Sequence, residues 1–122
     1  MKVVNKPWGR EIWIELNDKY CLKKLYINAG YRTSYQFHKE KRETVYVLDG
    51  EAVVFLENNA GEIKRHELAT GDYFSVPPKI KHRIVATTNL TLMEASTPEV
   101  DDVVRIEDDS NRTNGRIASE HE

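Results

Sequence analysis

Short runs of β-branched and aromatic residues recur along the whole chain, and each run is bounded by residues that form turns. Strands have this composition, whereas an amphipathic helix would repeat its apolar residues every three or four positions. The spacing predicts about nine strands. They cover residues 10–16, 20–28, 32–38, 43–48, 51–57, 62–68, 72–76, 82–88 and 90–96. The Asp49-Gly50 pair between two of these runs predicts a hairpin.

Many short strands hide their apolar faces and open edges only by packing as a sandwich or closing into a barrel. The length of 122 residues fits one domain. After residue 98 the chain becomes acidic with an apolar stripe, which predicts a short helix or an extended packing segment. We therefore expect an all-β domain over residues 1–109, with an N-terminal strand and a C-terminal clamp, and a flexible tail over residues 110–122.

Charge and cysteine content exclude several classes of protein. The net charge of −2 argues against nucleic-acid binding, because such proteins present an excess of basic residues. No segment is apolar over the length that a membrane span or a secretion signal requires. A single cysteine, Cys21, suits a reducing compartment. These features predict a cytoplasmic protein without nucleic-acid or membrane partners.

Four polar side chains are placed to converge inside such a barrel. Gln36 and His38 share one face of their strand because side chains alternate, and Glu43 begins the next strand. If residues 39–42 form a solvated turn between antiparallel neighbours, these three side chains meet, and His82 can join them from a distant strand. Such a set suits one divalent metal ion, with zinc favoured and manganese, iron, cobalt or nickel also accommodated.

Two spaced motifs then resemble those of the cupins. The first runs Gly30, five residues, Gln36, Phe37, His38, four residues, Glu43, six residues and Gly50. The second motif consists of these positions: Gly71, Pro77, Pro78, Lys79, His82 and Ala86. Glutamine replaces the usual first histidine, and Lys79 and Ala86 replace a glycine and an asparagine. The lysine implies a slightly different turn. The resemblance implies a single-domain cupin jelly-roll barrel, also called a double-stranded β-helix.

A narrower resemblance covers residues 6–112. The stretches Lys-Pro-Trp-Gly at 6–9, Ser-Tyr-Gln-Phe-His at 34–38 and Asp-Asp-Val-Val-Arg at 101–105 look like the cupin domain of type II phosphomannose isomerases. Lys6, Tyr35 and Ser110-Asn111 depart from the residues usual there. The resemblance implies metal-dependent interconversion of mannose 6-phosphate and fructose 6-phosphate through an enediol. It gives no reason to expect guanylyl transfer, because only the cupin part is matched.

This chemistry needs a proton-transferring group and cations for a phosphate dianion. Glu94 and Asp102 are the candidate bases, and Arg105 is the first candidate cation because it follows the recognisable Asp-Asp-Val-Val stretch. The segment around it could equally be a catalytic lid or a clamp that covers an edge strand. Further candidate phosphate ligands are Lys23, Lys24, Arg32 and Arg112, although the adjacent Lys23 and Lys24 cannot both face the interior.

Other functions remain open at this point. The chain could be a non-catalytic cupin that binds a sugar or another metabolite, or another metal cupin such as an iron dioxygenase. Iron dioxygenases, which more often keep a histidine at the position of Gln36, and metal-free sugar epimerases both fit the ligand set less well. Because an isolated barrel leaves strand 10–16 as a candidate edge, we also expect a homodimer.

Overall fold

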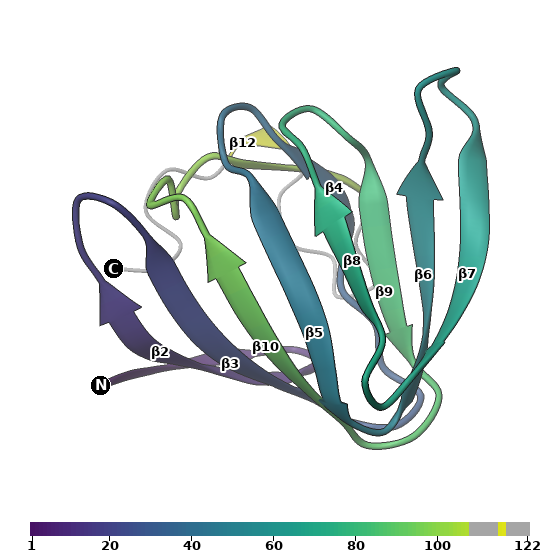
Figure 1. Cartoon of the computed structure of the whole chain (residues 1–122), viewed down its shortest axis with the longest axis horizontal. Helices are drawn as coiled ribbons and strands as arrows, with labels where there is room; N and C mark the ends of the chain where they lie inside the picture. The colour runs from purple at the N-terminus through teal and green to yellow at the C-terminus, as the bar shows by residue number, and fades with distance from the viewer. Residues whose placement is uncertain (108–114, 117–122) are drawn as a thin grey trace.

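Two antiparallel sheets face one another in the computed structural model, which describes residues 1–107 and 115–116 (Figure 1). Within this part, each sheet has six strands. The first sheet has the order β1 (Lys2–Lys6), β2 (Gly9–Leu16), β3 (Cys21–Ile27), β10 (Leu90–Ser96), β5 (Glu43–Asp49) and β8 (Tyr73–Val76). The second has the order β12 (Gly115–Arg116), β11 (Val103–Glu107), β4 (Tyr35–His38), β9 (His82–Ala86), β6 (Glu51–Glu57) and β7 (Ile63–Ala69). The predicted all-β jelly roll is confirmed. The described residues contain no helix long and apolar enough to cross a membrane.

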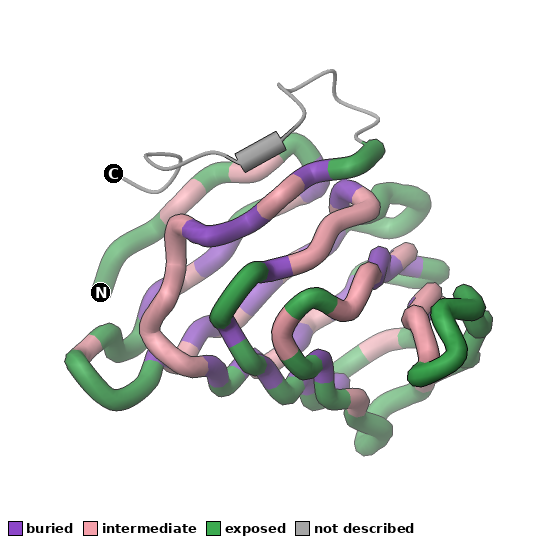
Figure 2. The backbone as a smooth tube through the Cα atoms, turned by 90° about the horizontal axis from the view of Figure 1, so that it is seen from above, coloured by how far each residue is buried: buried purple, intermediate pink, exposed green. Residues whose placement is uncertain are grey.

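Alternation along the strands builds the interior. On β5, Glu43, Val45 and Val47 are buried, and the residues between them are exposed. Figure 2 shows the same alternation of buried and exposed backbone in neighbouring strands. The apolar core therefore lies between the two sheets. Its buried members are Trp8, Leu25, Ile27, Val45, Val47, Ala52, Ile84, Ala86, Leu90 and Leu92.

All nine expected runs form strands, β2 to β10. The segment after residue 98 was expected as a short helix or an extended segment, and β11 shows that the extended alternative is correct. Because β11 pairs with β4, it covers the edge of the strand that carries Gln36 and His38. The segment is therefore paired along β4 in this structure. Most of the expected tail, together with the side chain of Arg112, lies outside the described residues.

Two expected strand pairings are wrong. Asp49-Gly50 does not close a hairpin, because β5 pairs with β10 and β8 whereas β6 belongs to the other sheet. Residues 39–42 likewise connect β4 to β5 across the two sheets. Local turn chemistry is the same for a hairpin and for a corner that changes sheets, so the sequence could not separate them. Gln36 and Glu43 consequently face each other across the barrel rather than along one ladder.

The expected edge strand is also different. Strand β2, which contains residues 10–16, is paired on both sides by β1 and β3. Strand β1 therefore lies at this end of its sheet, and β8 lies at the other end.

The turn before β9 keeps a glycine-like backbone despite its lysine. Lys79 has φ +70°, the left-handed conformation that glycine adopts most easily. Its backbone N–H donates to the carbonyl of His38 at 2.6 Å. This turn places the start of β9 beside the end of β4, where Gln36 and His82 are register partners.

We predict that Gly9→Ala destabilises the protein by about 2–4 kcal/mol, because a Cβ adds both backbone strain and a clash. Gly9 has φ +154°, and a Cβ there would lie 1.9 Å from the carbonyl oxygen of Tyr26. Urea unfolding measures the change. Gly30→Ala is the matched control, because its φ is +83° but no atom lies within 4 Å of the added Cβ. Gly30→Ala should lower the free energy of unfolding by only about 1–2 kcal/mol. Equal decreases for the two variants would contradict the prediction.

Candidate functional site

A cavity of about 80 Å³ opens between the two sheets. Trp8, Leu25, Val45, Phe74, Ile84, Leu92, Val100 and Val103 form its apolar wall. Polar and charged side chains form the rest of the lining: Lys6, Glu11, Lys23, Thr33, Ser34, Gln36, His38, Lys41, Glu43, His82, Glu94 and Arg105. This volume holds several water molecules at roughly 10–15 Å³ each, so part of a small ligand can enter.

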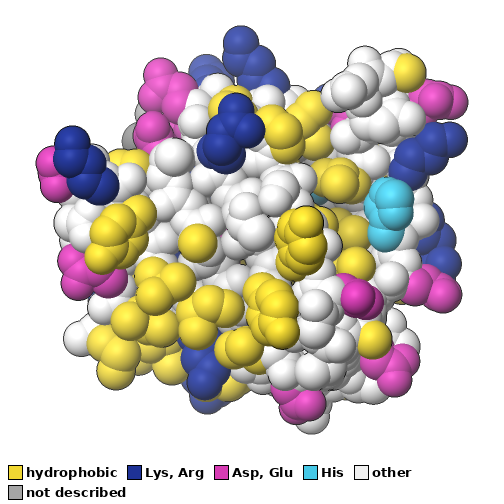
Figure 3. Space-filling model, in the orientation of Figure 1, with side chains coloured by type: hydrophobic (Ala, Val, Ile, Leu, Met, Phe, Trp, Pro, Cys, Tyr) yellow, Lys and Arg dark blue, Asp and Glu magenta, His cyan; other side chains and the backbone are white. Residues whose placement is uncertain are grey.

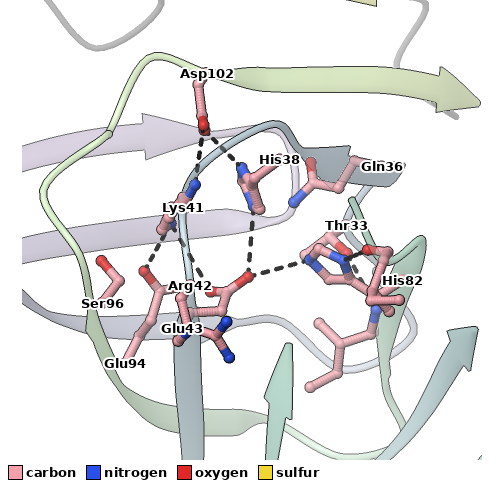
Figure 4. Close-up of polar contacts among 12 residues, drawn as sticks. Thr33, Gln36, His38, Lys41, Arg42, Glu43, His82, Glu94, Ser96 and Asp102 are labelled. Carbon is pink, nitrogen blue, oxygen red and sulfur yellow. Dashed lines mark hydrogen bonds and ion pairs between the residues drawn. The ribbon is translucent and has the colours of Figure 1, made fainter. Parts of the chain in front are cut away.

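Three buried side chains converge on one wall of this cavity. His38 ends β4, Glu43 begins β5 and His82 begins β9. One carboxylate oxygen, Glu43 Oε1, lies 3.4 Å from His38 Nε2 and 3.2 Å from His82 Nε2 (Figure 4). The candidate ligand atoms all lie within 4.8 Å of one another. Inward-facing positions on three strands of two sheets therefore make one cluster.

The protonation of this cluster fits a bound cation. His82 Nδ1 lies 3.0 Å from the carbonyl oxygen of Ile80, which can only accept a hydrogen bond, so Nδ1 carries the proton. The Nε2 lone pair of His82 then faces the Glu43 carboxylate, and this buried nitrogen has no hydrogen-bond partner in the described part of the chain. Two acceptors that face each other away from water are unfavourable unless a cation lies between them. Imidazole and carboxylate donors are those that zinc and related divalent metals bind.

Burial and neighbouring charges favour protonation states of the cluster that are suited to binding a metal. Burial lowers the pKa of His38, although Glu43 opposes this, and a neutral imidazole is the form that ligates metals. Burial alone would raise the pKa of Glu43, but the charge of Lys41 and the neighbouring imidazoles of His38 and His82 hold it well below its usual range. Glu43 is therefore an ionised carboxylate.

Gln36 lies on the same cavity wall. It is the register partner of His82 on the neighbouring strand, and it lines the cavity together with the three clustered side chains. Its Oε1 accepts a hydrogen bond from Ser34 Oγ at 2.7 Å. The structure thus brings together all four side chains that the sequence analysis proposed as metal ligands.

Lys41 is the main residue that the sequence analysis missed. Residues 39–42 were expected as a solvated turn, but the Lys41 side chain is buried, with Nζ 3.0 Å from Glu94 Oε2 and 3.8 Å from Glu43 Oε2. Burial would lower the pKa of Lys41, but Glu94 and Glu43 raise it above its usual value, so it is an ammonium ion. The turn crosses from one sheet to the other over the cavity, which is why one of its charged residues points inward.

Glu94 reaches the cavity from β10. Burial and then the charge of Glu43 raise the pKa of Glu94 to about 7, against the opposing effects of Lys41 and Lys23. Asp102 is also buried, but it is absent from the described cavity lining. Its Oδ2 accepts hydrogen bonds from the backbone N–H groups of Glu40 at 2.7 Å and Lys41 at 3.0 Å. Of the two candidate bases, only Glu94 lines the cavity.

The candidate phosphate ligands divide into two groups. Arg105 and Lys23 line the cavity. Arg105 is the register partner of Gln36. The Nζ atom of Lys23 lies 3.4 Å from Glu11 Oε1. Lys24 points to the outer face, over the ring of Tyr26, because it alternates with the inward Lys23. Arg32 is exposed in the segment before β4 and is not part of the described lining.

Comparisons with known proteins agree with this architecture. A candidate mannose-1-phosphate guanylyltransferase of Vibrio cholerae is 27% identical over 108 residues, which cover 84% of this chain but 22% of that protein. The structure of KdgF from Halomonas superimposes with a TM-score of 0.70 at 22% identity and covers 84% of this chain and 90% of that one. An RmlC-like cupin from Shewanella frigidimarina gives a TM-score of 0.69 at 25% identity, with 83% and 86% covered.

The cupin domain itself matches residues 25–95, the segment that carries Gln36, His38, Glu43 and His82. Because this match covers more than half of the chain and the fold agrees with it, the chain belongs to the cupin domain family.

Proposed function

We propose that this chain is a metal-dependent sugar-phosphate isomerase that interconverts mannose 6-phosphate and fructose 6-phosphate through an enediol. One observation carries the proposal: the clustered His38, Glu43 and His82 share a cavity wall with Gln36, and Glu94 lines the same cavity. When bound by these four ligands, a divalent metal, zinc by preference, would polarise the sugar carbonyl and stabilise the negative charge that develops on its oxygen.

Glu94 is the proposed proton carrier between C1 and C2 of the sugar. It is the candidate base that lines the cavity, and its ion pair with Lys41 at 3.0 Å holds its carboxylate in place. Such a base must lie within hydrogen-bond reach of the proton that it removes.

Arg105 is the proposed partner of the substrate's phosphate or of its oxygen atoms. It is buried on β11, is the register partner of Gln36, and lines the same cavity as the proposed metal ligands. Lys23 adds a second cation to the lining. Planar guanidinium groups suit the recognition of phosphate oxygens.

The Vibrio cholerae relative supports a role in mannose phosphate metabolism, since its name refers to mannose 1-phosphate. This chain matches only about a fifth of that relative's length, so guanylyl transfer is not part of the proposal. A cytoplasmic location is part of it, and the buried thiol of Cys21 is compatible with a reducing compartment.

A non-catalytic sugar-binding cupin is the second candidate function. The cavity ammonium groups of Lys23 and Lys41 are already paired with Glu11 and Glu94. A phosphate dianion must compete with these buried carboxylates, whereas an uncharged sugar need not. An iron dioxygenase could use the same histidine and glutamate ligands, and the metal that co-purifies with the protein distinguishes it.

We predict that zinc-loaded protein converts mannose 6-phosphate to fructose 6-phosphate, measured by a coupled assay. Removal of the metal with EDTA, and the variants Gln36→Ala and His82→Ala, should each reduce turnover at least about 100-fold, because they remove the proposed Lewis acid or its ligands. His66→Ala is the matched control, since His66 is exposed on β7. Zinc-loaded protein that leaves mannose, glucose and other hexose phosphates unchanged would support the binding module instead.

Glu94→Gln should lower kcat by about 100- to 10,000-fold, because it removes the proposed proton carrier while keeping the shape of the side chain. Zinc content and the substrate affinity should change little. Glu62→Gln, at an exposed position, controls for the loss of one carboxylate. A Glu94→Gln variant that retains wild-type turnover rules Glu94 out as the base.

We also expect a homodimer that buries the outer face of the first sheet. Tyr46 and Tyr73 are register partners on β5 and β8, and both are exposed, as is Leu48; Figure 3 shows hydrophobic side chains gathered on this side of the molecule. Exposed apolar patches of this kind mark interaction sites. Light scattering should give twice the chain mass, and Tyr46→Lys with Tyr73→Lys should give the monomer mass. Monomeric wild-type protein would contradict the dimer.

A further inference from the structure

We propose that Asp102 is a positioning residue that fixes the protonation of His38, so that His38 presents the lone pair of Nε2 to the metal. The inference rests on the metal site of the proposed function but not on the identity of the substrate. It gives Asp102, which was a candidate base in the sequence analysis, a different role.

The contacts of Asp102 carry this assignment. Its Oδ1 lies 3.3 Å from His38 Nδ1, both groups are buried, and neither atom has a geometrically ideal hydrogen bond in the described structure, so each is the other's nearest recorded polar contact (Figure 4). An ionised carboxylate only accepts hydrogen bonds, so a proton on Nδ1 is favoured. His38 then matches His82, whose Nδ1 faces the carbonyl oxygen of Ile80. Both Nε2 atoms are thereby left to face Glu43 Oε1.

The second oxygen of Asp102 prevents the carboxylate from rotating. Oδ2 accepts from the backbone N–H groups of Glu40 and Lys41, in the turn that follows His38. Asp102 itself directly precedes β11, whose first residue, Val103, is the register partner of His38. Strand pairing on one side and two N–H donors on the other thus hold Oδ1 toward the imidazole.

Asp102→Asn tests this arrangement with little change in shape. If the amide oxygen stays toward the two turn N–H groups, the amide NH₂ faces His38 Nδ1 and donates to it, which moves the imidazole proton to Nε2, the atom that must bind metal. If the amide rotates, its NH₂ instead opposes two N–H donors. Either orientation disfavours the metal-binding form of His38.

The first measurement is the ¹⁵N NMR spectrum of the histidine side chains in metal-free protein. It is recorded at a pH above the range in which histidine usually titrates. Wild-type His38 should carry its proton on Nδ1, and Asp102→Asn should move it to Nε2. The second measurement is calorimetric titration with Zn²⁺, for which the variant should bind roughly 10- to 100-fold more weakly. The control is Asp72→Asn, because Asp72 also accepts a turn N–H, that of Ala69 at 2.8 Å, but lies outside the described lining of the metal cavity.

A wild-type His38 with its proton on Nε2 would overturn the inference, and so would an Asp102→Asn variant that binds zinc as tightly as the wild type. The wild-type spectrum decides the matter even if the variant folds poorly. A wild-type protein that does not bind zinc would overturn both the inference about Asp102 and the proposed metal site. Absence of isomerase turnover with tight zinc binding would count only against the proposed reaction, so the two failures are distinguishable.

Discussion

The arrangement around Glu43 depends on one electrostatic constraint: an ionised carboxylate inside an apolar barrel needs positive charge close by. Lys41 lies near one of its oxygens, whereas Nε2 of His38 and of His82 face the other, where a cation would be needed between them. A carboxylate left without positive charge would take up a proton or destabilise the fold. Because these side chains come from β4, β9 and the turn before β5, they come together only when both sheets are closed around the cavity.

The two corners of the chain make this closure possible. At residues 39–42 and at Asp49-Gly50 the backbone leaves one sheet and enters the other, so that β5 faces β4 and β6 instead of pairing with them. The first corner also carries Lys41 inward over the cavity, and Asp102 binds its backbone N–H groups. Strand β11 is thus more than a cover for an exposed edge. It brings a carboxylate to the back of His38, and partners of this kind commonly orient the ligands of metal sites.

Much of this could be predicted from the sequence, because the period of two along a strand is local information. Alternation assigned Glu43, Val45 and Val47 to one face, and the same rule allowed only one of Lys23 and Lys24 to face the interior. The choice of partner strands is not local: the same Asp-Gly turn serves a hairpin or a corner. Alternation also ends in the connections, so nothing in the charged run at 39–42 marked Lys41 as buried.

The pairing of the cavity's charges bears on how a substrate would lie in it. Lys23 and Lys41 face Glu11 and Glu94, so an incoming phosphate at either lysine would lie close to a carboxylate. Arg105 occupies a different position, beside Gln36 on the neighbouring strand. In the proposed reaction, a phosphate directed toward Arg105 would leave the ion pairs of Lys23 and Lys41 intact while the sugar carbonyl lies near the clustered imidazoles. Breaking either of these pairs would leave a buried carboxylate without its cation, which is the costly step.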